Sequence, residues 1–143
     1  MFQLRFDESC APSYMTEHSV GADLKARIDV TVAPGQRALV PTGTWIADVD
    51  WAKVPCGAIP ELQVRARSGL AWKHGICLAN GVGTIDADYR DEICALLLNT
   101  TEQAFTIKAG ERVAQLVFAI AYRIDSLSVG GARGGGFGST GRS

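Results

Sequence analysis

Short alternating segments separated by turns rich in proline and glycine constrain the fold of this chain more than any other feature. Residues 2–6 and 61–67 alternate apolar and polar side chains with a period of two, which is typical of strands with one buried face. Further strands are expected over 22–32, 37–40, 45–49, 93–98, 104–107 and 112–121. Many short strands at this spacing predict an all-β sandwich, jelly roll or barrel.

Two segments depart from the alternating pattern. Ser68 is a suitable helix N-cap, residues 70–74 have room for one or two helical turns, and Gly75 is a suitable helix end. We therefore expect one short helix near 68–74. Residues 93–98 are continuously apolar, which predicts a fully buried strand.

Length and composition limit the classes of protein to consider. A chain of 143 residues is enough for one domain that buries ~68–70% of its unfolded surface. With 14 basic and 15 acidic residues the net charge is −1, so a basic face for direct nucleic-acid binding is not expected. No apolar run approaches the ~20 residues that span a bilayer, and no secretory signal is visible. Four widely spaced cysteines without Cys-x-x-Cys favour reduced thiols in a cytoplasmic protein.

The stretch from Asn80 to Tyr89 predicts a tight two-stranded hairpin with chemical groups at its rim. Its glycines bring bare backbone close to whatever lies there, and alternation hides Ile85 and Ala87 while exposing Asp86. Such a backbone could bind the edge of a flat heterocycle, Asp86 could activate a water molecule, and Tyr89 could pack against a sugar. The alternative is an ordinary hairpin with a polar face.

Anion-binding features lie elsewhere in the chain. Arg67, Ser68 and Gly69 place a cation, a hydroxyl and free amides at the expected helix start, although a plain N-cap beside a surface arginine is the alternative. Gln115 interrupts an apolar strand, so its amide either bonds a neighbouring backbone or faces a polar site. Asp23 is an early carboxylate whose alternative role is to cap a turn or strand end.

The last residues form a glycine-rich tail. We expect a β domain over 1–128 and a flexible arm over 129–143, because the tail has no apolar periodicity with which to pack. Phe137 among glycines could close over a planar base, and three other side chains could donate to phosphate oxygens: Arg133, Ser139 and Thr140. A plain flexible tail is the alternative. Together the hairpin, the anion-binding turn and the arm suggest a nucleoside triphosphate site.

Taken in order, five segments resemble the motifs of the trimeric dUTP pyrophosphatase (dUTPase) family: 21–24, 67–70, 80–89, 110–116 and 136–141. The resemblance implies a jelly-roll-like, β-clip fold and a homotrimer with three active sites between subunits. It implies hydrolysis of dUTP to dUMP and pyrophosphate by water attack on the α-phosphate, with Mg²⁺ held by the triphosphate. That reaction limits uracil incorporation into DNA and supplies dUMP for dTMP synthesis.

The resemblance also assigns roles by position. Asp86 is expected to be the general base, and Tyr89 to pack on deoxyribose and exclude a 2′-hydroxyl. Asn80 and the backbone that follows are expected to bind uracil, through Gly83, Thr84 and Ile85.

Phosphate binding falls to a second set of residues in the same resemblance: Arg67, Ser68, Gly69 and Gln115. The arm of another subunit is expected to close over uracil and phosphates through Arg133, Phe137, Gly138, Ser139 and Thr140. Asp23 is expected to order water around the magnesium ion, with no direct metal ligand from the protein.

Two alternatives stay open. A dCTP deaminase of the same fold would need a catalytic glutamate and Arg-Ser-Ser, and the Ile85-Asp86-x-x-Tyr89 pattern argues against it. A dUTP-gated regulatory protein, in which the nucleotide controls binding to an unknown protein partner, is the rival from another class. The stretch 48–61, with Trp51 and two prolines, could be such a partner surface, or a plain loop.

Overall fold

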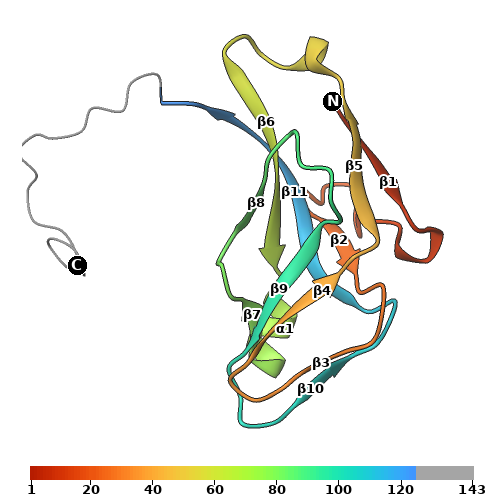
Figure 1. Ribbon diagram of the computed structural model, residues 1–143, viewed down its shortest axis with the longest axis vertical. Helices are drawn as coiled ribbons and strands as arrows, with labels where there is room; N and C mark the ends of the chain where they lie inside the picture. The colour runs from red at the N-terminus through yellow and green to blue at the C-terminus, as the bar shows by residue number, and fades with distance from the viewer. Residues whose placement is uncertain (125–143) are drawn as a thin grey trace, which may run out of the picture.

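A computed structural model describes residues 1–124 of the chain (Figure 1). This part contains eleven strands: β1 (Phe2–Phe6), β2 (Ala22–Lys25), β3 (Val30–Val32), β4 (Arg37–Pro41), β5 (Thr44–Val49), β6 (Ala58–Ala66), β7 (Ile76–Leu78), β8 (Gly83–Ile85), β9 (Cys94–Asn99), β10 (Phe105–Ile107) and β11 (Arg112–Tyr122). It also contains one α-helix and two 3₁₀ helices: α1 (Ser68–His74), η1 (Glu8–Cys10) and η2 (Trp51–Lys53). The expected arm, 129–143, and the expected domain boundary at 128 lie outside the described residues.

The strands form four antiparallel sheets. The largest has the order β2-β11-β6-β8, and a second has the order β4-β9-β7, while β1 pairs with β5 and β3 with β10. In Figure 1, β6 and β11 run alongside each other through the middle of the domain, and α1 lies near β7. The prediction of an all-β, jelly-roll-like domain with one short helix is confirmed.

The hydrophobic core lies between the two larger sheets. The four-stranded sheet contributes the buried side chains of Leu24 and Val64 to this core. Strand β9 of the three-stranded sheet contributes Ala95 and Leu97. Each large aliphatic side chain buried in this way contributes ~1.5–3 kcal/mol of transfer free energy. The polar edges described below are therefore presented by a well-packed scaffold.

Helix α1 has the expected position but begins differently. Arg67, not Ser68, occupies the N-cap with extended φ and ψ, and no side chain caps the first turn. Gly75 ends the helix at φ 62°, in the left-handed region that favours glycine. A Cβ atom there would lie only 2.5 Å from Cγ2 of Thr101, so packing also requires glycine. No helix in residues 1–124 is long and apolar enough to cross a membrane.

The predicted two-stranded hairpin at 80–89 is wrong. Leu78 of β7 pairs with Leu97 of β9, whereas Gly83 of β8 pairs with Val64 of β6. The turn between β7 and β8 therefore carries the chain from one sheet to the other. The predicted alternation beyond it is correct, since Ala87 is buried and Asp86 is exposed.

The strand at 93–98 is not fully buried either. In β9, Ala95 and Leu97 are buried, while Leu96 and Leu98 are partly exposed, because one face of the three-stranded sheet lies outside the core. The expected strand over 22–32 is likewise divided into β2 and β3, with Ala26 buried between them.

Candidate active site

A buried carboxylate organises the first half of the site. Asp23 on β2 is only 2% exposed, and Arg112 Nη1 donates a hydrogen bond to its Oδ2 at 2.9 Å. Arg67 Nε lies 3.5 Å from Oδ1, and Gln115 Nε2 donates to the same oxygen at 3.5 Å. We call these four residues the arginine cluster. One carboxylate thus holds two guanidinium groups and one amide in fixed positions.

Strand pairing brings the arginine cluster together. Asp23 lies opposite Gln115 in the β2–β11 ladder, and a register shift between Arg112 and Ala114 follows. Arg67 Nη1 donates to the backbone oxygen of Arg112 at 2.7 Å, which joins the start of α1 to β11. Gly21 leaves room for Gln115, because a Cβ at position 21 would lie 3.1 Å from Cβ of that glutamine. The predicted residues Asp23, Arg67 and Gln115 therefore meet.

A cavity of about 520 Å³ opens beside the arginine cluster; its lining residues are Arg67, Leu70, His74, Phe105, Thr106, Gly110, Glu111 and Arg112. Ser68 and Gly69 are exposed at the adjoining start of α1. The amide of Ala71 bonds the Arg67 oxygen at 3.1 Å, so the earlier amides have no partner within the helix. A Cβ at Gly69 would meet no atom within 4 Å. The cavity can therefore receive an anion against cationic side chains and bare backbone.

The second half of the site lies just beyond β8. Asp86 is exposed, and within residues 1–124 its carboxylate makes no ion pair or side-chain hydrogen bond. A cavity of about 150 Å³ adjoins it; the lining residues are Trp51, Ile59, Asp86, Ala87, Asp88 and Arg123. A carboxylate without a protein partner beside such a space can accept a proton from a water molecule.

Tyr89 is held close to Asp86 by backbone contacts. Its N–H donates to the Asp86 carbonyl oxygen at 3.1 Å, and its hydroxyl donates to the Glu92 carbonyl oxygen at 3.2 Å. Burial, followed by the charge of Asp91, raises the pKa of the Tyr89 phenol above its ordinary value. The phenol is therefore a neutral donor at physiological pH, and the residue is 37% exposed.

Strand β8 offers free backbone next to these groups. It pairs only with β6 and forms the edge of the four-stranded sheet, so its other edge has unpaired N–H and C=O groups within the described residues. A Cβ at Gly83 would lie 3.2 Å from Asn80 Nδ2, which places the Asn80 amide against this strand. Thr84 is exposed and Ile85 partly buried. The residues predicted to bind a base are thus together.

The two halves lie at opposite edges of the same sheet. Asp23 on β2 is level with Arg65 of β6, whereas Ile85 of β8 is level with Leu62, and Asp86 lies one residue further away. Three strand spacings and about four residues along a strand separate Asp23 from Asp86 by roughly 20 Å. Within one chain, therefore, the structure does not bring Asp86 to the arginine cluster.

The dUTPase family model matches residues 7–141 of the chain. The chain belongs to the dUTPase family. A deoxyuridine 5′-triphosphate nucleotidohydrolase from Anaeromyxobacter sp. (strain Fw109-5) is 45% identical over 136 residues, covering 92% of this chain and 87% of the relative.

Solved dUTPase structures share the fold. The dUTPase of Streptococcus mutans matches with a TM-score of 0.74 and 34% identity, covering 86% of this chain and 98% of that one. The dUTPase of Staphylococcus bacteriophage 80alpha matches with a TM-score of 0.75 over 99% of both chains. At 20% identity, that second likeness concerns the fold alone. The predicted family and fold are both confirmed.

Sequence reasoning did not place three residues at the candidate site: Arg112, Trp51 and Arg123. Arg112 falls in a matched motif, but its bond to Asp23 joins positions 89 apart, which only the β2–β11 pairing reveals. Trp51 belongs to η2 in a stretch predicted to be a loop or a partner surface, and it lines the Asp86 cavity with Arg123. No local pattern could have connected either residue to Asp86.

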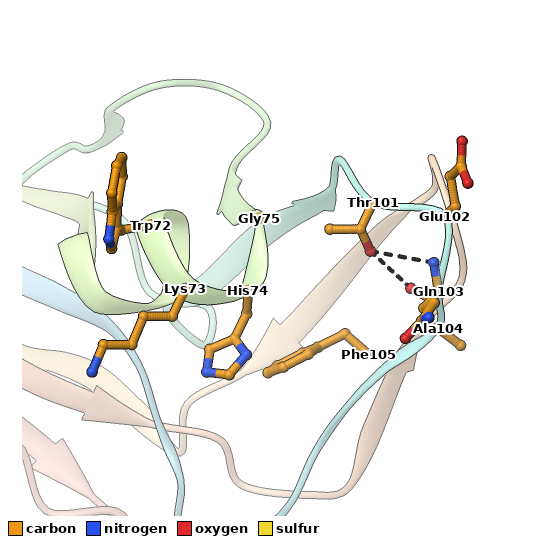
Figure 2. Close-up of a pocket in the computed structure, with 9 residues that line it drawn as sticks. All are labelled: Trp72, Lys73, His74, Gly75, Thr101, Glu102, Gln103, Ala104 and Phe105. Atoms are coloured by element: carbon orange, nitrogen blue, oxygen red, sulfur yellow. Dashed lines mark hydrogen bonds between the residues drawn. The ribbon is translucent and has the colours of Figure 1, made fainter.

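A further cavity lies outside the two halves of the site. It has about 550 Å³ and lies between the end of α1 and the residues before β10 (Figure 2). His74 and Phe105, whose ring centroids are 5.1 Å apart, line both this cavity and the one beside the arginine cluster. It contains none of the motif residues predicted to bind dUTP, so we do not assign it to the substrate.

The described residues do not form a protein-ligated metal site. Within 1–124 no group of three or more histidine, cysteine, aspartate or glutamate side chains could hold an ion. Asp23, predicted to act on magnesium through water, has its oxygens bonded by arginine and glutamine. The predicted arm residues lie outside the described residues: Arg133, Phe137, Gly138, Ser139 and Thr140.

Proposed function

We propose that this protein hydrolyses dUTP to dUMP and pyrophosphate, which limits uracil incorporation into DNA and supplies dUMP for dTMP synthesis. Membership of the dUTPase family and the 45% identical nucleotidohydrolase support the reaction. The observation that carries it in the structure is the pair of complementary half-sites. One presents Asp86 and Tyr89 beside a free strand edge, and the other presents organised arginines.

The chemistry needs little more than placement of charge. Asp86 accepts a proton from water as the water oxygen attacks the α-phosphorus. The bond from that phosphorus to the bridging oxygen of the β-phosphate breaks, and pyrophosphate leaves with the bonding electrons. Positioned cations stabilise the negative charge that shifts toward the leaving group. Arg67 and Arg112 supply the positive charge, and Gln115, the hydroxyl of Ser68 and the free amides at Gly69 supply neutral hydrogen-bond donors.

Base and sugar bind along β8. The backbone of Gly83, Thr84 and Ile85 has one unpaired edge, so its N–H and C=O groups bond the edge of uracil, with the Asn80 amide beside them. A site built to bond uracil rejects cytosine, since polar groups would be left unpaired. Tyr89 packs against deoxyribose and leaves no room for a 2′-hydroxyl.

The two half-sites of one active site come from different chains. Roughly 20 Å separates Asp23 from Asp86 within a chain, whereas a general base must reach the reaction through no more than one water molecule. A homotrimer with three shared sites satisfies both conditions. The arm of a subunit then closes over the nucleotide through Phe137, with Arg133, Gly138, Ser139 and Thr140 at the phosphates.

Magnesium enters with the triphosphate. Bound with the triphosphate, the ion would supply positive charge that neutralises the phosphates. Asp23 acts on this charge indirectly, by orienting Arg67 and Arg112. Ordering of water around the ion by Asp23 remains part of the proposal.

The setting we propose is the cytoplasm, where the four free cysteines stay reduced. The domain boundary at 128, with the arm over 129–143, belongs to the same proposal. Direct contact with nucleic acid is not part of it, because the net charge is −1.

Mixing two inactive variants tests the function and the sharing of sites together. Asp86→Asn removes the base and Arg67→Gln removes a phosphate ligand, and each variant alone should release little pyrophosphate from dUTP. After the two are unfolded and refolded together, about one site in four of a random trimer combines two intact halves. Activity should therefore return to about a quarter of the parental value.

Pyrophosphate release from dUTP, dCTP, dTTP and UTP by the parent protein is the control. Preference for dUTP without recovery in the mixture would place each site within one chain. Comparable rates for dUTP and dCTP would contradict dUTP hydrolysis as the function.

A further inference from the structure

One residue fastens the loop between β8 and β9, which carries Asp86 and Tyr89, to the rest of the domain. Oε1 of Glu92 accepts a hydrogen bond from the Gly43 N–H at 2.6 Å, and its Oε2 accepts one from Arg27 Nη2 at 2.7 Å. The Glu92 side chain is only 16% exposed; its bond from Gly43 is partly buried, whereas its bond from Arg27 faces solvent. We call these contacts the Glu92 anchor.

The backbone of Glu92 also contacts Tyr89. The Glu92 carbonyl oxygen accepts the Tyr89 hydroxyl at 3.2 Å, while the Tyr89 N–H is held by the Asp86 carbonyl oxygen. The next residue continues the attachment, because the Ile93 N–H donates to the Thr44 oxygen at 2.8 Å. The tyrosine ring is therefore fixed both at its backbone and at its hydroxyl.

The other side of the anchor is a crowded turn. Gly43 is buried with φ 61°, and a Cβ atom there would lie 3.0 Å from Asp7 Oδ2 and from Cys10 Cβ. Arg27 donates its N–H to the Pro41 oxygen at 2.8 Å, and its guanidinium lies 6.0 Å from the ring centroid of Trp45. Gly43 cannot shift without disturbing well-packed neighbours, whereas Arg27 is exposed and is held by its backbone bond to Pro41.

We propose that Glu92 is a positioning residue that sets the preference for deoxyribose over ribose. The inference rests on the proposed function, in which Tyr89 excludes the 2′-hydroxyl. A side chain excludes a ligand group sterically only when it cannot move aside. A displacement of that side chain by about 1 Å is enough to change rates strongly. Without the Glu92 anchor, the Glu92 carbonyl and the Tyr89 ring bonded to it gain freedom, and the ring moves aside for ribose.

The chain provides a matched control at another turn. Asp29 accepts the same two kinds of bond, from the Ala109 N–H at 2.8 Å and from Lys108 Nζ at 2.8 Å. It connects the end of β10 to the segment before β3, away from Tyr89. Removal of the Asp29 carboxylate shows how far the loss of two such bonds changes activity when they lie away from Tyr89.

The experiment compares kcat/KM for dUTP and for UTP in the parent, Glu92→Ala, Glu92→Gln and Asp29→Ala. In Glu92→Ala the ratio of the two constants should fall at least about tenfold, because 2′-hydroxyl exclusion weakens while the base is intact. Glu92→Gln should regain part of the ratio, since its amide oxygen still accepts the Gly43 N–H. Asp29→Ala should keep the parental ratio.

Equal losses for dUTP and UTP in Glu92→Ala would assign Glu92 a structural role only and overturn the inference. If Glu92→Ala does not fold, Arg27→Gln removes one of the two bonds and should lower the ratio about threefold; an unchanged ratio there would also overturn it. A parent protein without preference for dUTP over UTP would instead contradict the proposed function.

Discussion

The two half-sites differ in how much of their geometry one chain supplies. In the arginine cluster, the Asp23 carboxylate, 2% exposed, holds two guanidinium groups and an amide through bonds that join β2, β11 and the start of α1. At the other edge, Asp86 is exposed and has no side-chain partner within residues 1–124. The arginine cluster is thus held in place within one chain, whereas the proposed base is left free.

This difference fits the chemistry that we propose for each half. Groups that stabilise charge act best when they are fixed in advance, because no reorganisation is needed during the reaction. A general base must exchange a proton with water, and a permanent ion pair would lower its basicity. A buried cluster at one edge of the sheet and an exposed carboxylate at the other therefore suit their separate tasks.

The largest effect is expected at the free carboxylate. Asp86→Asn should keep the fold and nucleotide affinity but lower kcat by roughly 100- to 10,000-fold, because the proton acceptor is lost. Pyrophosphate release gives kcat, and a non-hydrolysable dUTP analogue gives the affinity. Asp88→Asn, two residues away and also exposed, is the control and should stay within about twofold. Turnover of Asp86→Asn within threefold of the parent would remove Asp86 from the mechanism.

The buried carboxylate should have a smaller effect on rate but a clear one on stability. Asp23→Ala leaves Arg67 and Arg112 without their shared acceptor, so unfolding free energy should fall by ~1–3 kcal/mol and kcat/KM by about 10- to 100-fold. Urea unfolding and steady-state kinetics measure the two quantities. A fall in kcat/KM without loss of stability would mean that Asp23 acts on the substrate or its metal ion, rather than by organising arginines.

The smallest effect is expected at Gly69. A Cβ at this position meets no atom within 4 Å, so Gly69→Ala should leave the melting temperature unchanged. If a phosphate approaches the backbone there, the added methyl group should cost ~1 kcal/mol of substrate binding, or about fivefold in kcat/KM. Calorimetry and kinetics on dUTP check both results. Unchanged kinetics would show that the phosphates do not come close to this residue.

Local patterns in the sequence located the helix and most of the strands, but not β7, the start of β6 or the division of 22–32 into β2 and β3. Alternation located β1 and most of β6, and Gly75 marked the end of α1 because its left-handed conformation and its contact with Thr101 both favour glycine. Local patterns did not show which strands pair. The segment at 80–89 has turn residues between apolar stretches, yet β7 and β8 pair with β9 and β6 in different sheets.

The site shows the same division between local and non-local information. Motif resemblance named Asp23, Arg67 and Gln115, and the structure brings these three together. It did not name Arg112 as their partner, since that bond depends on the register of β2 against β11. It also could not show that Trp51 and Asp86 line the same cavity, because these residues lie 35 positions apart on different elements.

The placement of the two half-sites at opposite edges of one sheet has a genetic consequence. If each active site takes one half from each of two chains, as we propose, a subunit with a damaged base can still lend its arginines to a neighbour. Two different defective alleles in one cell would then complement each other, although two copies of either allele would not. In the same arrangement, a chain that has lost both its base and its arginines would inactivate more than its own share of sites. Each trimer that contains one such chain would lose two of its three sites.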